Sequence, residues 1–174
     1  MTNAIIVMDI SGSMKEYVRG TNKSKFAILK EKLITILSDN NHRLTFDLCF
    51  FNDRLIKYGS YNEPSDVVKA LNTMNLNFNG GTKIWDCLKD VIENITSKDK
   101  TLILCFTDGE DSGSRETLEG IISTIKTKEK TELTIIDITG NLAENIKRKN
   151  TLIPEEIVRI NDVKQSFEHL EIEL

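Results

Sequence analysis

The chain has 174 residues and a mass of 19.8 kDa, a length typical of one domain with a single core, so we expect one domain over residues 1–174. Apolar residues make up 39%, charged residues make up 29% and the mean hydropathy is -0.27, which excludes a disordered or membrane-embedded chain. The net charge of -4 argues against a protein that holds nucleic acid by bulk positive charge.

The lengths of the apolar runs and the positions of the cysteines indicate the cellular compartment. Residues 4–8 form an apolar run that is shorter than the ~7–15-residue core of a signal peptide. No segment approaches the ~20 apolar residues of a membrane span. Cys49, Cys87 and Cys105 are odd in number, widely spaced and surrounded by apolar residues, which is typical of reduced core thiols. We therefore expect a cytoplasmic protein with no membrane contact.

Six short segments have the apolar pattern of strands. Residues 4–8 and 102–106 are continuously apolar and residues 133–138 are mainly apolar, as in strands that are buried on both faces of a parallel sheet. Residues 44–50 alternate, which indicates a half-covered strand near the sheet edge. A turn at Asn52-Asp53 and a return strand over 55–58 predict a hairpin there, and residues 157–160 form a weak last strand.

Helical periodicity fills the segments between these strands. The predicted helices, in chain order, cover residues 24–39, a short segment from Pro64, a segment from Thr82 through Ile95, residues 118–125, and a last helix marked by Val163, Phe167 and Leu170. The basic run 147–149 is expected to be a solvated helix face or loop. This alternation predicts an α/β fold, a Rossmann-like doubly wound sheet of mostly parallel strands with helices on both faces.

Oxygen-bearing side chains follow the predicted strands at the edge where such sheets bind ligands. Asp9, Ser11 and Ser13 follow the first strand, Asp108 follows the strand over 102–106, and Thr82 opens a helix after two glycines. Ligation by oxygen alone selects a hard cation such as Mg²⁺, Mn²⁺ or Ca²⁺ over zinc or copper. Two carboxylates roughly balance one divalent ion, which leaves the ion able to accept another anionic oxygen.

These motifs together resemble the von Willebrand factor type A domain. Asp9-Ile10-Ser11-Gly12-Ser13 matches its DxSxS motif, Gly81-Thr82 resembles its threonine loop, and Thr107-Asp108-Gly109 resembles its TDG element. The resemblance implies a metal-ion-dependent adhesion site and a six-stranded sheet with one antiparallel edge strand. It covers essentially the whole chain.

The resemblance also implies a role for each of the five residues. Ser11 and Ser13 would bind Mg²⁺ (or Mn²⁺) directly, Thr82 would bind it when ligand is present, and Asp9 and Asp108 would act mainly through bridging waters. A protein partner would complete the coordination with an Asp or Glu carboxylate. The expected function is thus a cation-dependent protein-interaction module that is not an enzyme.

Two other functions stay open at this point. Asp9 could be the nucleophile of a Mg²⁺-dependent phosphohydrolase or phosphotransferase, although haloacid-dehalogenase-like enzymes carry a second Asp where this chain has Ser11. The chain could also be a structural subunit with a vestigial metal site.

Each motif also has a purely structural interpretation. The segment from Asp9 to Ser13 could be a helix cap or a turn, Thr82 could be the N-cap of its helix, and Asp108 could be a turn residue. Glu110 and Asp111 are expected to be loop or rim acids and not ligands.

Overall fold

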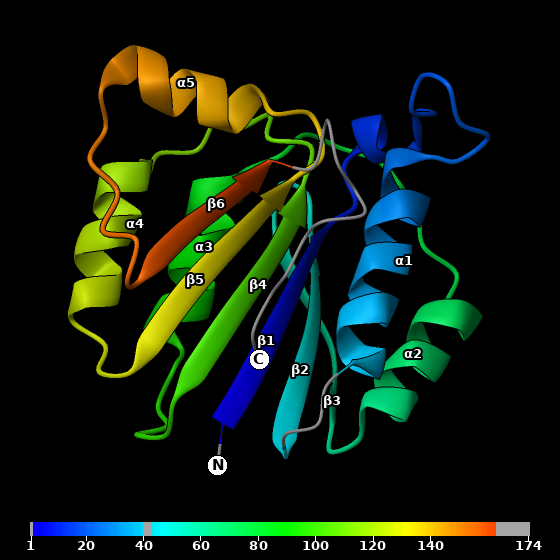
Figure 1. The fold of residues 1–174 in the computed structure, drawn as a ribbon, viewed down its shortest axis with the longest axis horizontal. Helices are drawn as coiled ribbons and strands as arrows, with labels where there is room; N and C mark the ends of the chain where they lie inside the picture. The colour runs from blue at the N-terminus through cyan, green and yellow to red at the C-terminus, as the bar shows by residue number, and fades with distance from the viewer. Residues whose placement is uncertain (1, 40–42, 163–174) are drawn as a thin grey trace.

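The computed structural model describes residues 2–39 and 43–162 of the chain. Within these residues a six-stranded sheet runs through the molecule in the order β3-β2-β1-β4-β5-β6 (Figure 1). All neighbouring strands are parallel except β2 and β3, which are antiparallel, so both the mostly parallel sheet and its antiparallel edge strand are confirmed. The strands are β1 (Thr2–Asp9), β2 (Leu44–Phe51), β3 (Leu55–Tyr61), β4 (Thr101–Thr107), β5 (Thr131–Asp137) and β6 (Val158–Asp162).

Strand burial follows the apolar pattern. Every residue of β4 is buried, as expected for a continuous apolar run in the middle of a sheet. The alternation predicted for residues 44–50 holds only in the first half of β2, where Asp47 is exposed, while residues 48–51 are all buried. The difference arises because both faces of this half of β2 are covered: Leu48 and Phe50 pack in one buried apolar cluster, and Cys49 and Phe51 pack in a second cluster on the opposite face of the sheet.

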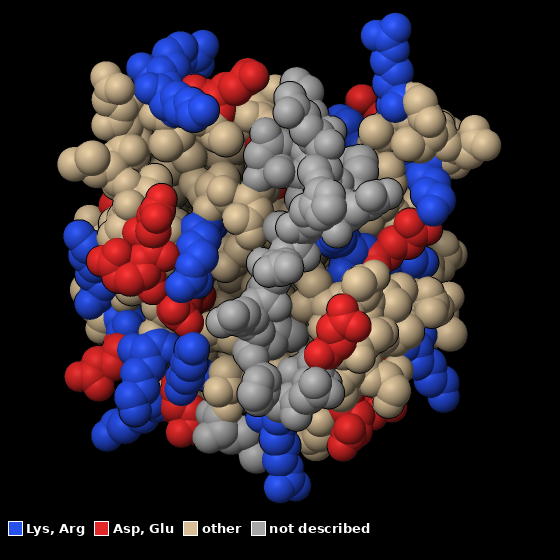
Figure 2. Space-filling model, viewed as in Figure 1, with Lys and Arg blue, Asp and Glu red and all other residues tan. Residues whose placement is uncertain are grey.

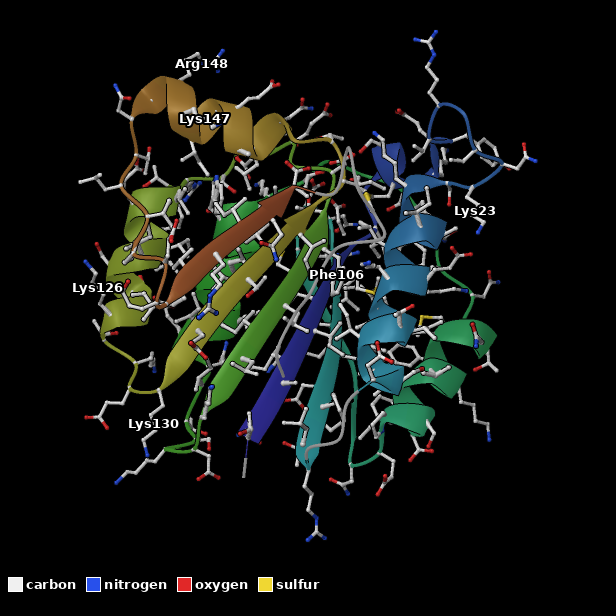
Figure 3. The ribbon with its side chains drawn as sticks, viewed as in Figure 1. Lys23, Phe106, Lys126, Lys130, Lys147 and Arg148 are labelled. Carbon is white, nitrogen blue, oxygen red and sulfur yellow. The ribbon has the colours of Figure 1, made fainter. Side chains whose placement is uncertain are left out.

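Helices cover both faces of the sheet, as the sequence predicts. In Figure 1, α1 (Lys25–Ser38) and α2 (Pro64–Thr73) lie in front, and α3 (Ile84–Glu93) and α4 (Leu118–Lys126) lie behind. One buried apolar cluster joins α1 and α2 to Phe106 of β4, which is labelled in Figure 3, and a second joins α3 and α4 to the opposite face. Each helix is therefore held by the apolar side chains that it buries against the sheet.

Two elements lie beside the carboxyl ends of the parallel strands. A short 3-10 helix, η1 (Gly12–Lys15), follows β1, and α5 (Asn141–Lys149) follows β5 (Figure 1). The helix α5 was not predicted, because it buries only Leu142 and its last turn is the basic run 147–149. This run therefore belongs to a helix, and Figure 3 shows Lys147 and Arg148 on it.

The remaining expectations for the fold are met in part. The expected helix over Val163, Phe167 and Leu170 lies outside the described residues. Cys49, Cys87 and Cys105 are buried and free, as expected of core thiols, and burial raises the pKa of Cys49 to about 11 and that of Cys87 to about 12. Among the described residues, no helix is long and apolar enough to cross a membrane.

Candidate metal centre

The centre is built where β1 and β4 end side by side. These strands are parallel neighbours, with Met8 opposite Phe106, so the residues that follow them meet at one edge of the sheet. The side chains of Asp9 and Asp108 are both fully buried there. Because burial of two carboxylates is unfavourable without compensating charge or hydrogen bonds, their surroundings decide what the site can hold.

Both carboxylate oxygens of Asp9 accept hydrogen bonds. Oδ1 accepts a hydrogen bond from the backbone N–H of Ser11 at 2.8 Å, and Oδ2 accepts one from the Thr107 hydroxyl at 2.8 Å. Burial raises the pKa of Asp9 to about 6, and repulsion from Asp108 adds to the rise despite the hydrogen bonds, which lower it. A nearby cation would remove this electrostatic penalty.

The two serines connect Asp9 to Asp108. The hydroxyl oxygens of Ser11 and Ser13 lie 3.2 Å apart, and the Ser13 hydroxyl donates a hydrogen bond to Oδ2 of Asp108. Ser11 occupies the N-cap position of η1 but makes no side-chain capping hydrogen bond. The helix-capping interpretation of this motif is therefore wrong, and the Ser11 hydroxyl faces its neighbours in the cluster.

The loop that carries Thr82 is joined by the backbone to the loop that carries Ser11 and Ser13. The N–H of Gly12 donates to the carbonyl of Gly80 at 3.3 Å, which places the threonine loop against the loop that carries the serines. Thr82 is itself buried. The N-cap of α3 is Lys83, so the interpretation of Thr82 as the cap of its own helix is wrong.

Asp111 and Ser112 hold the threonine loop in place. The backbone N–H of Thr82 donates to the Ser112 hydroxyl at 2.8 Å, and the N–H of Ser112 donates back to the Thr82 carbonyl at 2.6 Å. The N–H of Ile84 donates to the Asp111 carboxylate at 2.8 Å. Asp111 thus supplies the acceptor that the N-cap of α3 lacks, a role that the sequence could not indicate because the two segments are far apart in the chain.

Replacing Asp111 with Ala is expected to lower the free energy of unfolding by about 1 kcal/mol, because the first turn of α3 loses its acceptor. Urea denaturation followed by circular dichroism measures this change. The neighbouring Glu110→Ala variant, in which an exposed side chain is removed, should stay within about 0.5 kcal/mol of the wild type. Equal losses in the two variants would contradict the capping role of Asp111.

Asp137, at the end of β5, holds a loop that contacts the backbone of Asp108. Its carboxylate accepts hydrogen bonds from the backbone N–H groups of Thr139 and Leu142, each at 2.9 Å. The Thr139 hydroxyl donates to the backbone carbonyl of Asp108 at 2.7 Å. Asp137 was not predicted as part of the site because it lies inside the apolar segment 133–138, although an acid at the end of a buried strand is the signal that identified Asp9 and Asp108.

The residues fit a hard divalent cation. The described residues contain no cluster of three or more His, Cys, Asp or Glu side chains that could hold a metal ion, so any site here depends on hydroxyl oxygens beside the two carboxylates. Adjacent ligands in an octahedral Mg²⁺ site with bonds of 2.0–2.1 Å lie about 2.9 Å apart. The 3.2 Å between the hydroxyls of Ser11 and Ser13 is close to that value. The donor set therefore suits Mg²⁺ or Mn²⁺ and lacks the nitrogen and sulfur ligands that softer metals prefer.

Fold and loop arrangement together define a von Willebrand factor type A (VWA) domain. The chain belongs to the family of VWA domain containing CoxE-like proteins, whose family model matches residues 1–130. Domains of this class often serve as protein-interaction modules and are generally not enzymes. No curated protein matches the chain.

Solved structures share the fold at low sequence identity. The SpRpn10 VWA domain is 15% identical with a TM-score of 0.62, and the match covers 92% of this chain and 87% of that one. A von Willebrand factor type A protein from Catenulispora acidiphila is 18% identical with a TM-score of 0.64, over 94% of this chain and 38% of that one. Proximal thread matrix protein 1 from the mussel byssus, with a zinc-occupied MIDAS motif, is 22% identical with a TM-score of 0.70, over 97% of this chain and 42% of that one.

Proposed function

We propose that this chain is a divalent-cation-dependent protein-recognition module. Mg²⁺ or Mn²⁺ would be held by Asp9, Ser11, Ser13, Thr82 and Asp108, and an Asp or Glu carboxylate of a protein partner would complete the coordination. The observation that carries the proposal is the all-oxygen cluster at the carboxyl end of the sheet, in which Asp9, Ser11 and Asp108 are buried and Ser13 is partly buried. Membership of the VWA class supports it.

The five residues would have different roles in holding the cation. The hydroxyls of Ser11 and Ser13 would contact the cation directly, and Thr82 would do so when the partner is bound. Asp9 and Asp108 would supply negative charge mainly through bridging waters. When bound, the cation supplies the positive charge that holds the partner's carboxylate. We also propose that the domain acts in the cytoplasm, which the three free, buried cysteines support.

The burial and the hydrogen bonds of Asp9 argue against a phosphohydrolase that uses Asp9 as its nucleophile. A nucleophilic carboxylate needs an oxygen that can reach the substrate. The Asp9 side chain is fully buried, and its two oxygens accept hydrogen bonds from Ser11 and Thr107. These contacts favour an electrostatic role for Asp9 over nucleophilic attack.

The proposal is tested by affinity capture from a cytoplasmic extract on the immobilised chain. We expect at least one protein to be retained by the wild type in Mg²⁺ and released in EDTA. The Ser11→Ala variant should lose at least about 90% of this retention, because it loses a direct ligand of the cation. The Ser123→Ala variant, which changes an exposed serine on α4, should behave as the wild type.

Two outcomes would contradict the proposal. Retention of the same protein in EDTA and by Ser11→Ala would place recognition on another surface. A folded wild type that binds neither Mg²⁺ nor Mn²⁺ would favour the vestigial-site alternative.

A further inference from the structure

The cluster has an internal positive charge that the sequence analysis did not anticipate. The ammonium group of Lys25, the first residue of α1, lies 3.5 Å from Oδ2 of the buried Asp108. It also lies 3.5 Å from the carboxylate of Glu16, whose side chain is mostly exposed. The backbone N–H of Lys25 donates to the carbonyl of Glu16 at 2.9 Å, which fixes the start of α1 beside the loop that carries Ser13.

The placement of Lys25 is unusual for a residue with only a structural role. The first turn of a helix carries the positive end of the helix dipole, so a lysine there is electrostatically unfavourable. The first turn of α1 contains no acidic residue that would compensate it. The Lys25 side chain is only 15% exposed, so little of its charge is dispersed in solvent, and its ammonium group is shared between the buried Asp108 and the exposed Glu16.

The charges of the cluster change sign when a divalent cation enters. Among the buried side chains of the cluster, Asp9 and Asp108 carry two negative charges and Lys25 carries one positive charge, so these three sum to minus one without a cation. Glu16, which also pairs with Lys25, is screened by solvent and lies outside this count. With a divalent cation the same group is positive by one. Without Lys25 it would be neutral. Lys25 lies next to Asp108, and a cation held by the cluster would lie near the same carboxylate, so the two would repel each other and both would attract an incoming anion.

We propose that Lys25 is a specificity-determining residue that weakens binding of the cation alone and strengthens binding of a carboxylate ligand to the loaded site. The inference rests on the proposed function and concerns the charge balance of the same site. Lys25 competes with the cation for Asp108 and leaves the loaded site with a positive charge that a carboxylate neutralises. The module would thus bind its cation most tightly together with an acidic ligand.

The test uses Mn²⁺ as the cation and acetate as the carboxylate probe, with the full chain. Isothermal titration calorimetry gives the affinity for Mn²⁺, and water-proton relaxation of the Mn²⁺-loaded protein reports the water that acetate displaces. We expect Lys25→Met to bind Mn²⁺ about tenfold more tightly and acetate about tenfold more weakly than the wild type. Lys25→Arg, which keeps the charge, should stay close to the wild type in both.

Lys23→Met is the matched control. The Lys23 ammonium lies 2.8 Å from Glu31, both side chains are more than half exposed, and Figure 3 shows Lys23 on the outer side of the loop before α1. This variant should change neither affinity. Thermal denaturation verifies that each variant is folded before the titrations.

The possible outcomes separate this inference from the proposed function. If Lys25→Met binds Mn²⁺ no more tightly than the wild type, Lys25 only supports Asp108 structurally and the inference is overturned, while the metal site stands. If the effect on Mn²⁺ appears but acetate binding is unchanged, the proposed selectivity for carboxylates is wrong. If the folded wild type binds no Mn²⁺, the proposed function and this inference both fail.

Discussion

Asp9→Asn is expected to weaken Mg²⁺ binding by about 10- to 100-fold and, at neutral pH, to stabilise the metal-free protein. The loss of affinity follows from the removal of one of the two buried negative charges in the cluster. The gain in stability follows because the amide keeps the shape of the side chain without its charge. The amide oxygen of this variant still accepts from Ser11 and its amide nitrogen faces Thr107, so both neighbours of the carboxylate keep a polar partner.

The pH dependence of this gain has a definite sign. The pKa of Asp9 is raised from 3.8 to about 6 on folding, mainly by burial, so the native state holds this proton more tightly than the unfolded chain. The contribution to stability is therefore fully present below pH 3.8 and is lost as the pH rises through 6. In EDTA, Asp9→Asn should match the wild type near pH 4 and exceed it by about 3 kcal/mol near pH 7.

Urea denaturation from pH 4 to 8, with EDTA or with Mg²⁺, measures both effects. Mg²⁺ should stabilise the wild type and leave Asp9→Asn nearly unchanged, because only a form that binds the cation gains stability from it. Asp90→Asn, which changes an exposed acid on α3, is the control and should follow the wild type throughout. Parallel pH profiles of Asp9→Asn and the wild type would contradict the burial penalty assigned to Asp9.

Gly109→Ala is expected to lower the free energy of unfolding by about 3 kcal/mol, the largest loss among the stability variants. Gly109 has a φ of +77°, where an added Cβ costs about 1–2 kcal/mol. The same Cβ would lie 2.7 Å from a carboxylate oxygen of Asp137, which is fully buried and bound by Thr139 and Leu142. Displacing this carboxylate disrupts buried hydrogen bonds and adds about 1–3 kcal/mol.

Gly20→Ala separates the two causes. Gly20 has a φ of +83°, but no atom lies within 4 Å of the position of its added Cβ, so only the backbone cost applies there. Denaturation of both variants in urea should give about 1 kcal/mol for Gly20→Ala and a clearly larger loss for Gly109→Ala. Similar losses would show that the approach of Asp137 to Gly109 contributes nothing.

The sequence predicts most of the fold because burial dictates its pattern. The apolar segments over 102–106 and 133–138 form the strands β4 and β5, and Ser24 caps α1 by accepting from Ala27. The helix α5 was missed because it lies across the end of the sheet, as Figure 1 shows, and buries a single residue. Periodicity cannot identify a helix that packs so little apolar surface.

The sequence predicts the residues of the candidate site that lie in local motifs, but not the contacts that distant segments add to it. Asp9, Ser11 and Ser13 lie in one loop, and Asp108 was placed beside them by the rule for parallel strand ends. Contacts between distant segments carry no local signal, so the capping of α3 by Asp111 and the ion pair of Lys25 with Asp108 became visible only in three dimensions.

The surface around the site is uneven in charge, although the whole chain is acidic. Figure 2 shows Lys and Arg gathered over α5, whose last turn contributes Lys147, Arg148 and Lys149. Arg148 lines a groove of about 690 Å³ together with Gly109 and Glu110, which directly follow Asp108. The acidic residues Asp111 and Glu144 line the same groove, so a partner that reaches the candidate metal centre from this side would meet side chains of both charges.

Anomalous diffraction from crystals grown in MnCl₂ tests the metal centre most directly. We expect a single strong anomalous peak among the side chains of Ser11, Ser13 and Thr82, with Asp9 and Asp108 beside it, and a much weaker peak there in crystals of Asp9→Asn grown at the same MnCl₂ concentration. A well-ordered wild-type structure in Mn²⁺ with no peak between these residues would contradict the proposal that this chain holds a divalent cation at the carboxyl end of its sheet.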